Sequence, residues 1–297
     1  APRARLCLVP CRWMKFFVAS CLGPSMRFTI SVPLMTFASY PHTKKTMTML
    51  DRLPEFSAAK ISVNSRGYTI DGKKYARVTS ALGVINKPGL VGWARKVVMD
   101  KARDVLSRFG PSGGLFDLSA VMLEIEAAGS EREAAAALGT QIHGLIQQLW
   151  EKGAAVNIPQ ELSVPVLAAL DFLRAYEIQP IHTEFTVWAE ALQVAGTIDG
   201  VGLRHGRVVI WDWKTGRHIY PETALQLAAY ATLFQVTTGV EVHEAWAVRL
   251  PKQEGETFEA RRVADLPESY DTYRLALALQ AGLKHDPWVG EPREEDA

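Results

Sequence analysis

The pattern of apolar positions predicts a pair of adjacent strands in the second half of the chain. Small and β-branched residues run from 194 to 203, and a short apolar run over 208–211 follows them. The dipeptide His205-Gly206 lies between the two runs and supplies the glycine of a tight turn. Short apolar runs bounded in this way are typical of buried strands, so we expect an antiparallel hairpin.

The second strand of this hairpin carries charged residues close to its end. Asp212 and Lys214 lie two positions apart, and strand side chains at that spacing point to the same face of a sheet. Trp211 and Trp213 therefore take the opposite face. A hairpin of this length is expected to bring Asp199 of the first strand beside Asp212.

A helix is predicted directly after the hairpin. Residues 223–236 are rich in Ala and Leu and contain neither Gly nor Pro. Gln226 and Tyr230 are four positions apart, so they share one face of this helix. In isolation, the pair is better explained as one buried tyrosine and one solvated glutamine.

Another helix is predicted upstream, over residues 131–152. Four residues form its apolar stripe: Leu138, Ile142, Leu145 and Leu149. His143 lies beside this stripe, one turn after Gly139, where the missing side chain leaves room for a backbone or a ligand. A metal ligand and a packed core histidine are equal alternatives for His143.

The remaining elements complete a sheet. Strands are expected near residues 183, 195, 208, 243 and 259. A closing helix follows over 268–284. Together with the helices that carry His143 and Gln226, these strands predict an α/β fold with a central mixed β-sheet flanked by helices.

Two carboxylates at close range repel each other unless a cation or a proton lies between them. A hard divalent ion such as Mg²⁺ prefers oxygen ligands, acidifies bound water and neutralises charge on a scissile phosphate. Asp199, Asp212 and Lys214 therefore form the minimum set for metal-dependent hydrolysis of a phosphodiester. By themselves, the three residues are also compatible with a surface hairpin that carries an ion pair.

In combination, these motifs resemble the RecB-like branch of the PD-(D/E)XK nuclease superfamily. The order is Gly139 and His143 on a helix, Glu184 on a strand, then Gly-Thr-Ile-Asp, Asp-Trp-Lys-Thr-Gly and Gln-x-x-x-Tyr. That branch includes nuclease domains of bacterial recombination enzymes, many phage exonucleases and a mitochondrial genome-maintenance exonuclease. The resemblance covers residues 138–230 and implies a restriction-endonuclease-like core.

The resemblance also implies a role for each matching residue. Asp199 and Asp212 would bind Mg²⁺ or Mn²⁺, His143 would complete the ligand set, and the carbonyl of Trp213 would contribute. Lys214 would be the catalytic lysine. The positions that would orient the lysine or the nucleic acid are Gln226, Tyr230 and, as a phosphate contact, Arg217. Glu184 matches an acidic position of the first core strand and is a further candidate residue of the site.

Two departures from the superfamily pattern narrow the assignment. The second acidic position is Asp212, where many superfamily members carry Glu, and aspartate is usual in the RecB-like branch. Some members hold an iron–sulfur cluster with four cysteines, whereas this sequence has three, at Cys7, Cys11 and Cys21. All three precede the core, so we expect no iron–sulfur cluster.

The length, composition and charge of the chain limit the kind of protein that it can form. The chain has 297 residues, of which 48% are hydrophobic and 22% charged, which is enough for one sizeable core plus an accessory segment. The net charge is only +1. Residues 1–50 contain seven basic residues and no acidic one, so the remaining 26 basic and 32 acidic residues give a net charge of −6. A nuclease with this balance must concentrate positive charge locally, and Arg204, Arg207, Lys214 and Arg217 are the candidates.

The charge pattern and the elements suggest four segments. Residues 1–50 are interpreted as a leader or translated upstream sequence outside the fold; a transit peptide and a start at Met47 or Met49 are the alternatives. Residues 51–130 form a mainly helical N-terminal accessory region. The nuclease core spans 131–285, and an acidic tail over 286–297 is expected to be loose.

The sequence therefore predicts a Mg²⁺- or Mn²⁺-dependent deoxyribonuclease. The resemblance favours an exonuclease of recombination, repair or phage DNA metabolism that acts on single-stranded or free DNA ends. A structure-specific endonuclease and a non-catalytic DNA-binding partner of a recombinase are the alternatives. A recombinase or a single-strand-binding protein would be the protein partner, and no membrane association is expected. The expected location is the cytoplasm of a bacterium or phage-infected host, or the mitochondrial matrix if residues 1–50 are a transit peptide.

Overall fold

A computed structural model describes residues 27–30, 59–64, 67–85, 134–150 and 156–284, with six isolated residues between 96 and 107. The tail after 284, most of 1–50 and most of 86–133 lie outside this part of the chain. Contacts divide the chain into a main unit, residues 1–85 and 147–297, and a smaller unit, residues 86–146. Among the described residues, no helix is long and apolar enough to cross a membrane.

The strands and helices have the following bounds. The strands are β1 (Arg27–Ile30), β2 (Ile61–Asn64), β3 (Gly67–Ile70), β4 (Lys73–Arg77), β5 (Val156–Pro159), β6 (Gln179–Ala189), β7 (Val194–Arg204), β8 (Arg207–Lys214), β9 (Glu244–Arg249) and β10 (Glu259–Arg262). The helical elements are α3 (Val78–Ala81), η1 (Leu82–Val84), α6 (Gln160–Ala175), η2 (Glu190–Leu192), α7 (Glu222–Thr238) and α8 (Leu266–Gly282). A further helix covers residues 134–150.

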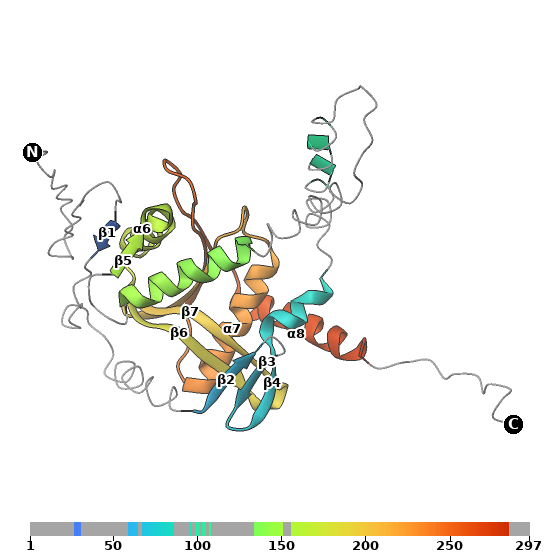
Figure 1. Ribbon diagram of the computed structural model, residues 1–297. Helices are drawn as coiled ribbons and strands as arrows, with labels where there is room; N and C mark the ends of the chain where they lie inside the picture. Colours follow the sequence, from blue (N-terminus) through green and yellow to red (C-terminus); the bar gives the residue numbers. More distant parts are fainter. Residues whose placement is uncertain are drawn as a thin grey trace, which may run out of the picture. The chain divides into compact units, whose positions relative to one another are not determined.

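The main unit is built on one mixed sheet, with the strand order β10-β9-β8-β7-β4-β3-β2 and β6 paired to β7 (Figure 1). The pairs β8–β9 and β4–β7 are parallel, while the other pairs of this sheet are antiparallel. This confirms the predicted α/β class and the five predicted core strands. The strands β1 and β5 form a separate two-stranded sheet, and β1 lies inside the segment that we assigned to a leader.

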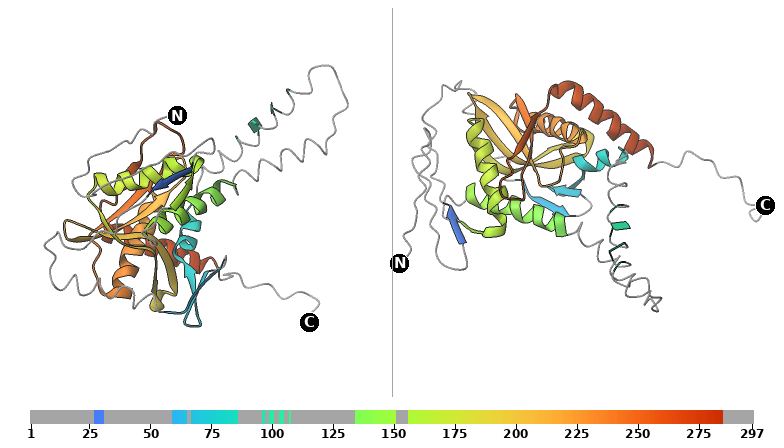
Figure 2. Two further views of the ribbon diagram at one scale, coloured as in Figure 1. Left: turned by 60° about the vertical axis from the view of Figure 1, so that its left-hand side comes forward. Right: turned by 90° about the horizontal axis from the view of Figure 1, so that it is seen from above.

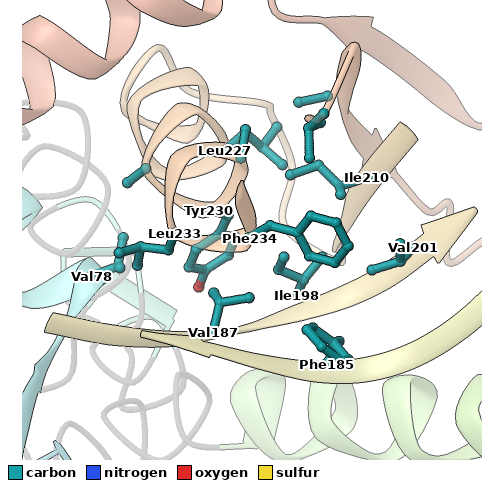
Figure 3. Packing of buried hydrophobic residues seen from close by; sticks show 14 of the residues in the cluster. Val78, Phe185, Val187, Ile198, Val201, Ile210, Leu227, Tyr230, Leu233 and Phe234 are labelled. Carbon is teal, nitrogen blue, oxygen red and sulfur yellow. The ribbon is translucent and has the colours of Figure 1, made fainter. Parts of the chain in front are cut away.

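One face of the sheet packs on α7. Figure 3 shows Tyr230 and Phe234 of α7 pointing toward Val187 and Ile198 of the sheet. These residues belong to one buried cluster that also includes Ile210. α8 packs on α7 in turn (Figure 2). The predicted helix over 223–236 is therefore confirmed, and burial of its apolar side chains against the strands is what stabilises it.

The other face of the sheet packs on α6, a helix that the sequence analysis missed. Phe172 of α6 lies 5.7 Å from Trp213 and 6.5 Å from Trp211, measured between ring centroids. Both tryptophans therefore point away from α7, as the two-residue period of the strand predicted. Apolar residues recur along α6 with helical spacing at Leu162, Val166 and Leu173. That pattern was a usable signal, although Pro165 inside the helix obscured it.

The N-terminal strands extend the central sheet. β3 and β4 form an antiparallel hairpin, with Asp71 and Gly72 at its turn. β2 adds a third antiparallel strand, and β4 pairs in parallel with the start of β7. The accessory region that we expected to be mainly helical therefore contributes three strands to the sheet.

Candidate active site

The strands β7 and β8 separate beyond their last regular pair, and we call this separation the fork. The predicted acidic residues lie at the fork. Regular pairing between these strands ends at Gly200 and Trp211, and β8 then continues to Lys214 beside β9. At the other end of the same edge of β7, β4 pairs with Val194 and Ala195. Asp199 lies in the gap between these two pairings. A gap of this kind leaves polar backbone and side-chain groups of a buried strand available for other partners.

Asp199 takes the place of a backbone acceptor across the fork. The backbone N–H of Trp213 donates to Oδ2 of Asp199 over 2.6 Å. Both Asp199 and Asp212 are buried, at 9% and 4% relative exposure. The register that pairs Gly200 with Trp211 also sets Asp199 opposite Asp212. The structure thus brings the two carboxylates to neighbouring positions, as the hairpin pattern predicted.

Asp212 is held by a network that reaches from β8 into α7. Its Oδ2 lies 2.5 Å from Nζ of Lys214, and its Oδ1 accepts a hydrogen bond from Nε2 of Gln226 over 2.9 Å. Oε1 of Gln226 accepts from Lys214 over 3.1 Å, and Nε2 also donates to the hydroxyl of Tyr230 over 3.0 Å. Gln226 is buried at 8% exposure, so the alternative of a solvated glutamine is wrong. Its amide orients the lysine and the carboxylate together.

The glycine of the Gly-Thr-Ile-Asp stretch makes room for this network. A Cβ atom on Gly196 would lie 2.4 Å from Cε1 of Tyr230, closer than carbon atoms approach in folded proteins. Gly200 has the same relationship to the ring of Trp211, at 2.0 Å. The two glycines therefore allow aromatic rings to lie against β7 on either side of Asp199.

The environment keeps Lys214 protonated. Burial by itself would lower the pKa of Lys214, but the adjacent Asp212 carboxylate outweighs it and raises the pKa above the usual lysine value. Burial raises the pKa of Tyr230 well above that of a free tyrosine. At neutral pH Lys214 is thus a cation and Tyr230 a neutral hydroxyl, so neither is poised as a general base.

Glu184 adds a third acid beside Asp199. The β6–β7 register joins Thr183 to Gly200 and Phe185 to Ile198, which sets Glu184 opposite Asp199. One carboxylate oxygen from each of these two residues lies within 4.8 Å of the other. Glu184 has a φ of 51°, in the left-handed region that is rare for a residue other than glycine. A residue in this conformation costs about 1 kcal/mol or more of folding stability, and such residues are concentrated at functional sites.

The other predicted residues have less specific surroundings. Trp213 contributes its N–H to Asp199, while its indole is buried against α6. Arg217 is exposed in the connection between β8 and α7. His143 is half-buried on the helix over 134–150, in the smaller unit. On that helix, Ile142, Ile146 and Leu149 are buried; of the predicted stripe, Leu138 and Leu145 are only half-buried.

Arg204 has a structural partner that sequence reasoning missed. Its Nη1 lies 3.1 Å from Oε1 of the buried Glu244, and its Nε donates to the carbonyl of Tyr176 over 3.0 Å. Trp246 donates to the same Glu244 carboxylate over 3.0 Å. The expectation that Arg204 belongs to a phosphate-binding cluster is therefore not supported. Nothing in the sequence marked Glu244, 40 positions away, as its partner.

Comparison with known proteins gives a family match and distant structural similarities. Residues 160–289 match the family model of the PD-(D/E)XK nuclease superfamily. A search among curated proteins finds no match. A solved structure from Eubacterium rectale described as a "putative exonuclease" is 13% identical, with a TM-score of 0.34, and the match covers 54% of this chain and 77% of that one. The protein SSO0001 is also 13% identical, with a TM-score of 0.28 and coverage of 65% and 86%. The family match supports a hydrolytic nuclease.

Proposed function

We propose that this protein is a divalent-metal-dependent nuclease that hydrolyses phosphodiester bonds of DNA. The observation that carries the proposal is the buried network at the fork, in which Asp212 contacts both Lys214 and Gln226 next to Asp199. Burying two carboxylates beside a half-buried lysine costs free energy, and hydrophobic residues of similar size would stabilise the fold at least as well. Their presence is better explained by chemistry than by stability.

The acidic residues have the donor chemistry of a Mg²⁺ or Mn²⁺ site. Asp199 and Glu184 lie on adjacent strands with carboxylate oxygens within 4.8 Å, and Asp212 is opposite Asp199 on β8. We assign Asp199 and Asp212 as the principal ligands and Glu184 as a further one. A bound divalent ion would supply Lewis-acid charge that acidifies water and neutralises the scissile phosphate.

We assign His143 and the carbonyl of Trp213 to the remaining ligand positions. The proposal for His143 rests on its place in the order of the motifs, ahead of Glu184 and Asp199, and on its imidazole nitrogen, a donor that a divalent ion accepts. The proposal for Trp213 rests on its position between Asp212 and Lys214 and on the hydrogen bond from its N–H to Asp199. That hydrogen bond orients the Asp199 carboxylate.

Lys214 acts as a fixed positive charge. Its raised pKa keeps the ammonium protonated, so it donates a hydrogen bond to the attacking water or to a phosphate oxygen as negative charge develops there. Gln226 holds the ammonium through Oε1 and Asp212 through Nε2, and Tyr230 fixes the amide in this orientation. Arg217, exposed just beyond β8, supplies a phosphate contact at the rim of the site.

The finer assignments follow the resemblance to the RecB-like branch. We propose an exonuclease of recombination, repair or phage DNA metabolism that acts on free or single-stranded ends and uses no iron–sulfur cluster. A recombinase or a single-strand-binding protein would deliver the substrate in the cytoplasm. The support for these points is the order of the motifs, from the helix of His143 to the Gln-x-x-x-Tyr pair of α7.

Digestion of labelled DNA tests the proposal. The full chain is incubated with single- and double-stranded oligonucleotides labelled at one end and blocked at the other, in Mg²⁺ or Mn²⁺. We expect stepwise shortening from an open end and loss of activity in EDTA. Cutting of covalently closed circular single strands would instead identify an endonuclease. If neither DNA nor RNA is degraded with either metal, while the protein still binds DNA, the chain is a binding partner and not an enzyme.

A further inference from the structure

We propose that the three-stranded extension β2–β3–β4 is the surface that holds the phosphate backbone of DNA beside the active site. This inference rests on the proposed nuclease function and names where its substrate lies. It uses residues 60–77, none of which belongs to the acidic network at the fork.

The first observation is the distribution of charge. Residues 60–77 contain five basic residues and one acidic residue: Lys60, Arg66, Lys73, Lys74 and Arg77, against Asp71. By contrast, residues 109–297 contain 14 basic and 27 acidic residues. An acidic catalytic segment repels a phosphate backbone at long range, so the attraction must come from another part of the chain. The extension is a strongly basic segment that is also joined to the catalytic sheet.

The second observation is that the extension has two unlike faces. Tyr68, Ile70 and Tyr75 are buried together with Ala195 of β7 in a small apolar cluster, which anchors the extension to the sheet. In the strand register, Lys74 lies opposite Thr69, and Thr69 lies opposite Ser62. These three residues occupy the other face, because side chains alternate along each strand. Lys74 and Ser62 are exposed and Thr69 is half-buried, so this face is polar and basic.

The third observation is the position of the extension relative to the fork. Arg77 at the end of β4 is in register with Ala195 of β7, and Asp199 lies four residues further along β7. At the rise of an extended strand, four residues span about 13 Å. DNA phosphates bound along β4 would therefore lie within a few nucleotides of the scissile bond.

Arg77 is held in place at this junction. Its guanidinium lies 5.3 Å from the ring centroid of Tyr68, and its Nη2 donates to the carbonyl of Asn64. The Tyr68 hydroxyl in turn lies 3.1 Å from Oγ1 of Thr197, two residues before Asp199. Arg77 shares the face of Tyr68 and Tyr75, opposite to Lys74, so it fixes the junction with β7 and is not one of the residues that we propose to hold phosphate.

The basic residues of the extension differ in how far they are already paired. Lys73 forms an ion pair with Glu190 and is therefore partly neutralised. Lys60 and Lys74 have exposed side chains, and the interaction of Lys60 with Asp71 is made by its backbone N–H. Lys60 and Lys74 are thus the residues whose charge is most readily offered to DNA.

Salt-dependent binding of the full chain to DNA tests the inference. The double variant Lys60→Gln, Lys74→Gln is compared with a matched double variant, Lys252→Gln, Arg262→Gln, which removes two positive charges from exposed positions at or beyond the opposite edge of the sheet. Fluorescence anisotropy with a labelled single-stranded oligonucleotide in EDTA gives the dissociation constant at several NaCl concentrations. Each lost phosphate contact lowers the slope of log K against log salt by about 0.7 on single strands. We expect a loss of about 1.4 in the extension variant, with weaker binding, and an unchanged slope in the matched variant.

The two proposals fail in different ways. Equal slopes for the wild type and the extension variant, or an equal loss in both double variants, would overturn the assignment of the surface and leave the nuclease function untouched. Wild-type protein that binds DNA in a salt-dependent way, and loses the expected slope in the extension variant, but cuts no substrate would overturn the nuclease function alone. Thermal melting of each variant confirms that the glutamines have not unfolded the sheet.

Discussion

The backbone N–H of Trp213 donates a hydrogen bond to the side chain of Asp199 across the fork between β7 and β8. In a regular ladder this N–H would have a backbone carbonyl as its partner. A carboxylate in that role is fixed in orientation. The fork, at the open end of the hairpin, is therefore where the fold holds an acidic side chain in a fixed orientation.

Removing the charge of Asp212 or of Lys214 is expected to abolish nuclease activity. Because Lys214 stabilises charge that develops in the transition state, Lys214→Met should lower kcat by about 10²–10³-fold with KM little changed. Asp212→Asn should lower activity at least as much. Digestion of end-labelled DNA measures the loss, and circular dichroism checks the fold. Lys252→Gln, an exposed change in the connection between β9 and β10, is the control and should retain activity.

His143→Ala is expected to weaken metal binding. A histidine ligand contributes directly to affinity, so loss of the imidazole should raise the dissociation constant for Mn²⁺ by about tenfold or more. Isothermal titration of the full chain with Mn²⁺ measures this change. Unchanged affinity for Mn²⁺ combined with a lower melting temperature would show that His143 is a packed core residue and not a metal ligand.

Glu184→Gly is expected to stabilise the folded protein while weakening its binding of Mn²⁺. Glycine adopts the left-handed backbone of position 184 without the strain of a side chain, so the free energy of unfolding should rise by about 0.5–1 kcal/mol. Loss of the carboxylate should weaken Mn²⁺ binding. Glu184→Gln separates the two effects, because it removes the charge and keeps the strain. Denaturant unfolding would contradict the prediction if Glu184→Gly were less stable than Glu184→Gln.

Gly196→Ala is expected to disturb Tyr230. The added methyl group would meet the Tyr230 ring at 2.4 Å, and overpacking of this kind costs about 1–3 kcal/mol of stability. Movement of Tyr230 would also displace Gln226 and lower activity. Gly83→Ala is the matched control, because nothing lies within 4 Å of a Cβ at Gly83. Similar urea midpoints for the two variants would count against this packing argument.

Alkaline pH is expected to destabilise the protein partly through Tyr273. Burial raises the pKa of Tyr273 above that of a free tyrosine, and within the described part of the chain its hydroxyl has no hydrogen-bond partner. The unfolded chain releases this proton near pH 10 and the folded chain only at higher pH, so stability is full below pH 10 and falls above it. Tyr273→Phe should therefore be neutral or slightly stabilising at pH 7 and should lessen the loss above pH 10. Urea unfolding of both proteins at pH 7 and above pH 10 measures the difference.

Local patterns were sufficient for much of the fold and for part of the site. Alternation along 208–214 predicted which side chains face α7, because a strand has a period of two regardless of its neighbours. The four-residue spacing of Gln226 and Tyr230 predicted their shared face for the same kind of reason. The helix α6 was missed because its proline interrupts a pattern that is otherwise helical.

Other features depended on contacts between distant segments. The sequence by itself determined the residue types of the site and their order along the chain, since strand and helix periods act over a few residues. Only the tertiary structure decided that β7 and β8 part at Asp199, that Glu184 adopts a left-handed backbone opposite it, and that Arg204 is paired with Glu244. These features depend on which strands lie side by side and on the space left by glycines 196 and 200, and no local pattern encodes such long-range packing.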